Sequence, residues 1–254
     1  MSKRLTDKVA VVTGAARGLG RAYAEALASE GAAVVAADIV DCSDTAAAVT
    51  AAGGSAIACP LDAADGDSAA TMAATALDAY GGIDILVNNA ALYGSLSSGP
   101  FDRLDEAEWD ACMAVNVKGI WNCSRAVVGA MKDQGGGSII NISSLAATFG
   151  LPFALHYTTS KAAVIGMTRG MARELGRHWI RVNAIAPSAV MTEGTEAFFG
   201  DKLDKAAETI RKNQCLQENL ETGDLVGTVL VLASADSRFI TGQTIMVDGG
   251  TTLL

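Results

Sequence analysis

A strand–helix–strand unit at the start of the chain, joined by a glycine-rich turn, constrains the fold more than any other feature. Residues 8–13 form a short apolar, β-branched run that stops at Gly14. From Gly18 onward, apolar residues recur with the spacing of one helix face, and residues 32–37 form a second apolar run that ends at Asp38. A β-α-β unit of about 30 residues is the building block of sheets with parallel strands.

The alternation of strands and helices continues along the whole chain. Strands that are apolar on both faces must be covered by helices on both sides, which requires a parallel sheet. Residues 1–254 are therefore predicted to form one α/β domain, a Rossmann-like, doubly wound parallel sheet of about seven strands. Further strands are expected at 55–59, 83–87, 138–142, 180–184 and 244–247, and helices at 45–52, 67–80, 106–132, 156–176 and 222–233.

Charge and composition exclude several classes of partner. A formal net charge of −9 disfavours nucleic acid and anionic membrane surfaces, because polyanion binding needs a basic footprint. The sequence has no run of about 18 consecutive apolar residues, so no membrane span is predicted. The five cysteines are scattered without C-x-x-C spacing, and the two histidines lie far apart. We therefore expect a cytoplasmic protein with reduced thiols and no metal site.

The turn after the first strand carries three glycines, Gly14, Gly18 and Gly20, in the spacing G-x-x-x-G-x-G. Glycines let the backbone turn tightly and approach a pyrophosphate, and a helix N-terminus presents free N–H groups to that anion. A glycine triple alone also fits an ordinary tight turn between a strand and a helix. Its position between an apolar strand and an amphipathic helix favours dinucleotide binding.

Asp38 closes the second strand, where an acidic residue can accept hydrogen bonds from the ribose hydroxyls of adenosine. A carboxylate there repels the 2′-phosphate of NADP, so Asp38 predicts NAD as the cofactor. Arg17, in the glycine-rich turn, favours a phosphate and hence NADP. We give Asp38 more weight because it lies at the ribose, although it could also be an ordinary polar cap of the strand.

Tyr157 and Lys161 have the spacing i and i+4, which makes them neighbours on one helix face. A tyrosine ordinarily ionises near pH 10, and a positive charge beside it favours the phenolate and lowers that pKa. Tyr157 could then take a proton from an alcohol or return it to a ketone. A tyrosine and a lysine at this spacing are common by chance, so the pair needs support from other residues.

Polar residues at strand ends give that support. Ser143 and Ser144 follow the strand at 138–142, and Asn89 follows the strand before it. Ligands of open α/β sheets bind beyond the carboxyl ends of the strands, so these side chains are expected at one site. Asn116 is an amide in an otherwise apolar helical stretch, and could belong to this site, face water or cap a kink.

The chain resembles the short-chain dehydrogenase/reductase family over essentially its whole length, and together the matching motifs are highly specific. The resemblance implies a hydride transfer between a nicotinamide cofactor and a small-molecule substrate. The matching stretches are Thr13 to Gly20, Asp38, Asp62, Asn88-Asn89-Ala90, Asn116-Val117, Ser144, Tyr157 with Lys161, Pro187 to Thr192, and Ile240 to Gly250.

By resemblance, Ser144 rather than Ser143 polarises the substrate oxygen, and Tyr157 is the acid and base. Lys161 would hold the ribose and tune Tyr157, while Asn116 would help to place a water in a proton relay. The resemblance also implies contacts of Asp62 with adenine and of Asn89 with the adenine-side ribose region. Val190 and Thr192 would contact the nicotinamide carboxamide. The residues expected to bind the cofactor, NAD, are Gly14, Arg17, Gly18, Leu19, Gly20, Asp38, Asp62, Asn89, Tyr157, Lys161, Pro187, Val190 and Thr192.

Two residues depart from the family pattern, which has glycine at both places. Ala91 adds a methyl group that a small site should tolerate, and Ser188 adds a polar group that could line the substrate site. His156 points about 100° away from Tyr157 around the helix. We expect it to pack or cap, with a substrate-pocket role or a second acid–base role as alternatives.

The expected substrate walls are largely apolar, which favours a hydrophobic or aryl-substituted secondary alcohol. Residues 193–221 mix charged and apolar residues without strong periodicity, and we interpret them as a flexible lid; the alternative is a plain surface excursion. The expected wall residues are Leu92, Tyr93, Leu145, Phe149, Leu151, Ala189, Met191, Phe198 and Phe199.

Two other functions stay open. An NADPH-dependent 3-oxoacyl reductase of the same family is favoured weakly by Arg17 and opposed by Asp38. A catalytically silent nucleotide sensor would have no need of Ser144, Asn116, Tyr157 and Lys161 together. The apolar faces of the helices at 106–132 and 156–176, with the family resemblance, predict a homotetramer.

Overall fold

The computed structural model describes residues 3–253, which form one seven-stranded parallel sheet with the strand order β3-β2-β1-β4-β5-β6-β7. The order reverses between β1 and β4, and such a switch point opens a crevice beyond the carboxyl ends of the strands. The predicted single, doubly wound α/β domain is confirmed. The strands are β1 Val9–Thr13, β2 Ala33–Asp38, β3 Ser55–Pro60, β4 Ile85–Asn88, β5 Gly137–Ile142, β6 Ile180–Pro187 and β7 Thr244–Val247.

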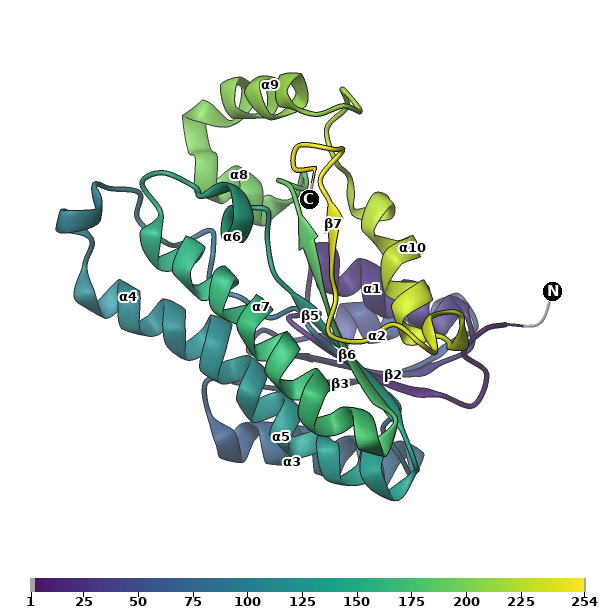
Figure 1. The fold of residues 1–254 in the computed structure, drawn as a ribbon. Helices are drawn as coiled ribbons and strands as arrows, with labels where there is room; N and C mark the ends of the chain where they lie inside the picture. Colours follow the sequence, from purple (N-terminus) through teal and green to yellow (C-terminus); the bar gives the residue numbers. More distant parts are fainter. Residues whose placement is uncertain (1–2, 254) are drawn as a thin grey trace.

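Helices cover both faces of the sheet (Figure 1). The longer helices fall close to the predicted ranges, because their apolar stripes are long enough to be read from the sequence. The helices are α1 Gly18–Ser29, α2 Ser43–Ala51, α3 Gly66–Tyr80, α4 Glu106–Met113, α5 Gly119–Asp133, α6 Ala146–Phe149, α7 Leu155–Leu175, α8 Glu193–Phe199, α9 Leu203–Asn213 and α10 Thr222–Ala233.

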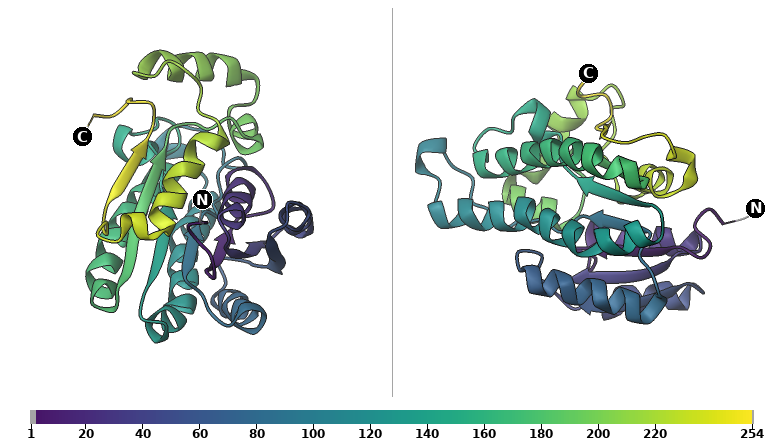
Figure 2. Two further views of the ribbon diagram at one scale, coloured as in Figure 1. Left: turned by 90° about the vertical axis from the view of Figure 1, so that its right-hand side faces the viewer. Right: turned by 60° about the horizontal axis from the view of Figure 1, so that its bottom comes forward.

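Successive residues of the central strands point into different cores. Val12 on β1 packs in a cluster with Leu27 of α1 and Leu225 of α10. Val11, its neighbour, packs in a second cluster with Met72 of α3 and Val127 of α5. Figure 2 shows the two helical layers on either side of the sheet. The buried sheet therefore holds its carboxyl edge rigidly, and the loops at that edge carry the polar residues singled out above.

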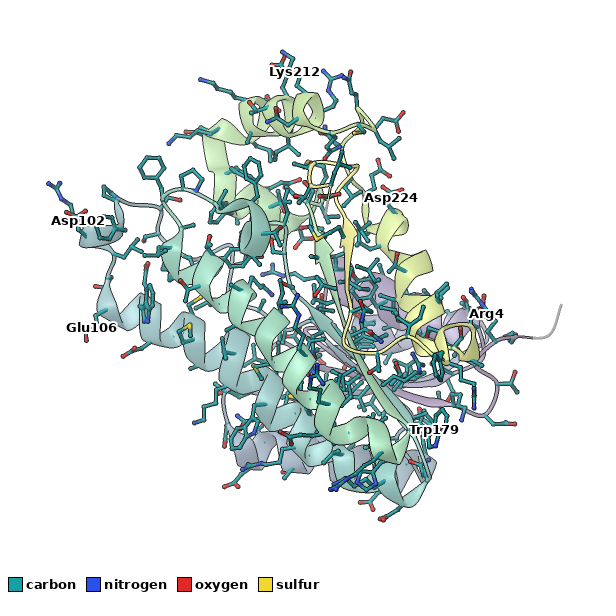
Figure 3. All side chains as sticks on the ribbon, viewed as in Figure 1. Arg4, Asp102, Glu106, Trp179, Lys212 and Asp224 are labelled. Carbon is teal, nitrogen blue, oxygen red and sulfur yellow. The ribbon has the colours of Figure 1, made fainter. Side chains whose placement is uncertain are left out.

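The predicted helix at 106–132 is divided by a π-helical turn, Ala114–Lys118, between α4 and α5. The segment 193–221, for which no regular periodicity was predicted, contains α8 and α9. α8 has only seven residues, which is too few for a clear period. α9 does carry apolar residues at helical spacing, Leu203, Ala206, Ala207 and Ile210, which the sequence analysis missed; they are half-buried, and no residue of α9 is fully buried. Figure 3 labels Lys212 on α9, which lies above the sheet with its charged side chains pointing outward.

Two strand boundaries also differ from the prediction. β4 begins at Ile85, two residues late, and β6 continues to Pro187, beyond the predicted end at 184. The extension follows from the pairing of β6 with β7, which runs up to the pair Pro187 and Val247. Among residues 3–253, no helix has both the length and the apolar character needed to cross a bilayer.

Candidate active site

A cavity of about 780 Å³ lies at the carboxyl edge of the sheet. Its walls come mainly from the ends of six strands, from α8 with the segment before it, and from α9. Each of these strand ends contributes a residue that the sequence singled out. They are Gly14 after β1, Asp38 at the end of β2, Asp62 after β3, Asn89 after β4, Ser144 after β5 and Pro187 at the end of β6.

The glycine-rich turn has the close backbone packing that its glycines predict. Gly14 and Gly18 have φ values of 66° and 55°, in the left-handed region that favours glycine. A Cβ on Gly20 would lie 2.0 Å from the carbonyl oxygen of Gly14, so only glycine fits there. No side chain among residues 3–253 caps the start of α1. Its first N–H groups therefore suit an anionic group such as a pyrophosphate.

Asp38 stands at the cavity wall with its carboxylate fixed by the backbone. Its Oδ2 accepts a hydrogen bond from the Ala16 N–H at 3.0 Å, and its Oδ1 accepts one from the Val40 N–H at 3.2 Å. These bonds leave lone pairs for a ribose hydroxyl, because each carboxylate oxygen can accept two hydrogen bonds. Asp38 thus fixes the backbone at the end of its strand, and it also lines the cavity.

Arg17 lies in the same wall but is paired elsewhere. Its guanidinium is 3.2 Å from the carboxylate of Glu193, at the start of α8, and both side chains are exposed.

Thr45 also supports the glycine-rich turn, and the sequence analysis missed it. This residue is fully buried, and its hydroxyl donates a hydrogen bond to the Ala15 carbonyl at 2.9 Å. A threonine inside a short, alanine-rich helix gives no sequence signal of such a contact.

Asn89 holds the glycine-rich turn in place. Its Nδ2 donates to the carbonyl oxygens of Thr13 and Gly14, both at 3.0 Å. The hydroxyl of Thr13 in turn accepts from the backbone N–H groups of Asn89 and Ala90, again at 3.0 Å. Both donors of the Asn89 amide are therefore used within the protein, and only its oxygen is left for the expected ribose contact.

The other predicted cofactor residues are divided between the cavity and its support. Asp62 lines the cavity, and its carboxylate also accepts from the Ala64 N–H at 2.9 Å. Gly20 lies behind the wall, where it allows the tight turn described above. Four more of the predicted cofactor residues line the cavity: Leu19, Pro187, Val190 and Thr192.

Ser144, Tyr157 and Lys161 meet at one end of the cavity. Lys161 is buried, and its Nζ donates to the Ile142 carbonyl at the end of β5, 2.8 Å away. The hydroxyl of Ser143 donates to the Lys161 carbonyl, also at 2.8 Å. These two bonds fix α7 on the end of β5. The hydroxyl of Ser143 is thereby engaged with the backbone of α7, although both Ser143 and Ser144 line the cavity.

The electrostatics of this group differ from the prediction. Burial raises the pKa of Tyr157 to about 12, and the hydrogen bond with Ser144 opposes that rise only in part. Burial likewise lowers the pKa of Lys161 to about 8. The expected lowering of the Tyr157 pKa by Lys161 is therefore not found in the protein alone. The Nζ lies 5.7 Å from the centre of the tyrosine ring and is bonded to Ile142.

Asn116 sits in the π-helical turn and is fully buried, which rules out the alternative that it faces water. Its Oδ1 accepts from the Leu92 N–H at 2.7 Å, and its Nδ2 donates to the Leu92 carbonyl and to the Ser160 hydroxyl, both at 3.1 Å. The hydroxyl of Ser160 donates to the Tyr157 carbonyl at 2.8 Å. Asn116 thus braces the loop after β4 and α7, and its side chain is not among those that line the cavity.

An aromatic stack stands beside Tyr157. The ring of Tyr93 lies 4.8 Å from that of Tyr157 and 4.5 Å from that of Phe198 on α8, centre to centre. Of the nine predicted wall residues, Met191 and Phe198 are not among the lining residues, and Phe198 packs behind Tyr93. The wall residues that do line the cavity are Leu92, Tyr93, Leu145, Phe149, Leu151, Ala189 and Phe199.

The two departures from the family pattern are both accommodated. Ala91 and Ser188 line the cavity. The Ser188 hydroxyl is buried and has no hydrogen-bond partner among residues 3–253. An unpaired buried hydroxyl is unusual in a folded protein, so the Ser188 hydroxyl is a group that a ligand could satisfy.

Comparison with protein families gives a match over residues 14–252 to a model described as enoyl-(acyl carrier protein) reductase. An uncharacterized oxidoreductase of Mycobacterium tuberculosis is 46% identical over 96% of this chain and 97% of its own length. A 3-oxoacyl-[acyl-carrier-protein] reductase of Staphylococcus epidermidis is 39% identical over 96% of this chain and 98% of its own.

Solved structures have the same fold over nearly the whole chain. A protein described as a short-chain alcohol dehydrogenase from Sinorhizobium meliloti superposes with a TM-score of 0.92 at 35% identity, covering 99% of this chain and 98% of that one. A protein described as an NAD(P)-dependent gluconate 5-dehydrogenase from Beutenbergia cavernae, with NADP at low occupancy, superposes with a TM-score of 0.91 at 35% identity, covering 99% of each.

Proposed function

Because the chain belongs to the short-chain dehydrogenase/reductase family and is thus an oxidoreductase, we propose that it transfers a hydride between NAD and a secondary alcohol or its ketone. One observation carries this proposal. Ser144, Tyr157 and Lys161 share one cavity with the glycine-rich turn and Asp38. A nucleotide held by that turn would extend toward the tyrosine. A silent nucleotide sensor would have no use for the three polar groups at the far end.

In this proposal, each of the three groups handles charge or a proton at a stated atom. The Ser144 hydroxyl orients the substrate oxygen, and the Tyr157 Oη takes the alcohol proton during oxidation or returns it during reduction. The Lys161 ammonium holds the ribose and contributes positive charge near the phenol. Bound NAD⁺ would supply the hydride acceptor and a further positive charge, which favours the phenolate against the burial that opposes it.

NAD is proposed as the cofactor because the Asp38 carboxylate faces the cavity at the end of β2. Bringing the 2′-phosphate of NADP beside that carboxylate places like charges together in a partly enclosed site. Arg17, the group that would favour this phosphate, is paired with Glu193. The residues expected to hold NAD therefore favour the coenzyme without the phosphate.

The coenzyme preference can be tested at Asp38. We expect kcat/KM to be higher with NAD⁺ than with NADP⁺, and Asp38→Ser to reduce that preference ~10-fold, which corresponds to ~1.4 kcal/mol. Asp62→Ser, a change of another carboxylate on the same wall, is the matched control and should leave the preference largely unchanged. Equal kcat/KM values for the two coenzymes in the wild type would contradict the assignment of Asp38.

A hydrophobic or aryl-substituted substrate is proposed from the cavity walls. The residues that line the cavity are mostly apolar, and they include the aromatic rings of Tyr93, Phe149 and Phe199, which suit an aryl group. The test is a panel of aliphatic and aryl secondary alcohols with NAD⁺, followed by the appearance of reduced nicotinamide. We expect aryl-substituted alcohols to give the largest kcat/KM.

The second candidate is an NADPH-dependent 3-oxoacyl reductase, which the names of the 39% identical relatives favour. The same panel should include a 3-oxoacyl thioester with NADPH. Turnover of that ester at a kcat/KM above that of every alcohol would replace the alcohol dehydrogenase proposal with this candidate.

We also propose that residues 193–221 act as a lid. The contacts that join its first helix, α8, to the rest of the site include the pairing of Arg17 with Glu193 and the stacking of Tyr93 on Phe198. The loop after β4, which carries Gly94, also packs closely against α8, since a Cβ on Gly94 would lie 3.0 Å from the carbonyl oxygen of Gly194. Hinged segments over an active site commonly exclude water and commit the substrate.

A homotetramer is proposed as the assembly. Large apolar side chains remain exposed on the single chain, among them Trp121 on α5, Trp179 before β6 and Phe239 before β7. Arg238, the neighbour of Phe239, lies over the Trp179 ring, so two of these side chains belong to one region of the surface. Apolar groups gathered in this way are typical of surfaces that another subunit covers. Light scattering at micromolar concentration is expected to give the mass of four chains, and the mass of one chain would refute the proposal.

A further inference from the structure

His156 immediately precedes Tyr157 on the first turn of α7 and is fully buried. The residue that caps this helix is Ala154, which has no side-chain acceptor for the free N–H groups of the first turn. The helix that carries Tyr157 and Lys161 therefore begins without the serine, threonine or aspartate that usually fixes such an end.

The imidazole of His156 takes over part of this task. Its Nδ1 accepts a hydrogen bond from the backbone N–H of Tyr157 at 2.8 Å. An N–H can donate only to a nitrogen that has a lone pair, so this bond requires Nδ1 to be unprotonated. In the neutral ring the proton is then on Nε2, which is the nitrogen that points away from the helix backbone.

The other side of the ring faces Glu108 on α4. The His156 Nε2 has no hydrogen-bond partner among residues 3–253, and the Glu108 Oε2 lies 4.0 Å from it. The Glu108 carboxylate accepts from the N–H and the hydroxyl of Ser97, at 3.0 and 2.8 Å. Ser97 belongs to the loop after β4, which also carries Tyr93 against the ring of Tyr157. The His156 ring is thus bonded to the helix backbone on one side and faces a fixed carboxylate, without a hydrogen bond, on the other.

We infer that His156 is a positioning residue for Tyr157, which acts through the hydrogen bond at Nδ1. This inference rests on the proposed role of Tyr157 as acid and base. The phenol oxygen is at the far end of its side chain, so a small rotation of the backbone at residue 157 moves that oxygen by a larger distance. A displacement of 1 Å at a reacting group can lower the rate by ~10²-fold.

Two substitutions separate the two nitrogens of the ring. His156→Asn keeps an acceptor, Oδ1, at the place of Nδ1 and removes the group facing Glu108. His156→Gln keeps an amide near the place of Nε2 and removes the acceptor near the backbone. His156→Leu removes both, and His178→Asn, a change of the exposed second histidine, is the control.

We expect His156→Asn to retain kcat within about twofold of the wild type. His156→Gln and His156→Leu should lose ~10-fold or more in kcat, with little change in NADH affinity, because the nucleotide end is untouched. A loss of activity in His156→Asn equal to that in His156→Leu would overturn the inference, since the acceptor would then not matter. Wild-type kcat in all three variants would overturn it equally.

A measurement on the wild type keeps the inference testable if a variant fails to fold or if the proposed reaction is wrong. The ¹⁵N chemical shifts of the His156 ring report which nitrogen carries the proton, without any substrate. We expect Nδ1 to be unprotonated and Nε2 to be protonated. A proton on Nδ1 would exclude the bond to the Tyr157 N–H and overturn the inference, whereas failure of every alcohol as a substrate would overturn only the proposed function.

Discussion

Tyr157→Phe is expected to lower kcat for alcohol oxidation by ~10²-fold or more, while NADH still binds, because general acid–base catalysis typically contributes this much. The substitution removes one oxygen atom and keeps the ring that packs against Tyr93. The cavity wall and the nucleotide end should therefore stay as they are. Initial rates with saturating NAD⁺, together with NADH titrations followed by fluorescence, measure the two effects separately.

Tyr80→Phe is the matched control for this substitution. Tyr80 ends α3, its hydroxyl pairs with that of Ser55 at 3.2 Å, and neither residue is among those that line the cavity. Removing that hydroxyl should leave kcat close to the wild-type value. Near-normal turnover in Tyr157→Phe would contradict the proposed mechanism, whatever the substrate proves to be.

Lys161→Met is expected to abolish most activity and to weaken NADH binding, yet to stabilise the free protein. Methionine fills a similar volume without a charge. Burial lowers the pKa of Lys161 to about 8, and a lysine shifted this far from its ordinary value costs the folded state about 3 kcal/mol at neutral pH. The expected gain in the free energy of unfolding is about 1–3 kcal/mol, because the bond to Ile142 is lost as well.

The direction of the Lys161 pKa shift also determines how the stability of the wild type changes with pH. The folded state disfavours the charged lysine, so its pKa is below the unfolded value. Between about pH 8 and about pH 10.5 the unfolded chain binds more protons than the folded one at this site. The lysine therefore destabilises the fold fully below pH 8, and this penalty is relieved as the pH rises through that window.

Urea unfolding at a series of pH values measures the effect. The difference in unfolding free energy between Lys161→Met and the wild type, both without coenzyme, should be largest below pH 8 and should shrink toward pH 10.5. A difference that stays constant over this range, or a less stable Lys161→Met at pH 7, would show that Lys161 carries its charge in the fold without penalty.

Much of the site could be predicted from the sequence because its motifs are local. The glycines of the first turn are forced by contacts within a few residues, such as that of Gly20 with Gly14. Apolar runs in the sequence predict the strands, and parallel strands place their carboxyl ends at one edge. The structure accordingly has Tyr157, Lys161 and Ser144 in the wall of one cavity at this edge.

The contacts that could not be predicted are made between residues far apart in the chain. The Asn116 side chain bonds to Leu92 and Ser160, which lie 24 and 44 residues away from it in the chain. The pKa of Tyr157 is raised, where the spacing to Lys161 predicted the opposite, because burial depends on everything packed around the ring. Spacing on one helix gives proximity, while partners and solvent exposure come from tertiary packing.

The transfer of deuterium from substrate to coenzyme tests the central claim most directly. The best secondary alcohol of the panel, deuterated at its carbinol carbon, is oxidised with NAD⁺ by the wild type and by Tyr157→Phe, and the mass of the NADH is measured. The account predicts one deuterium in each NADH formed by the wild type, and far less NADH from the variant. NADH without the label, or equal yields from both proteins, would contradict hydride transfer assisted by Tyr157.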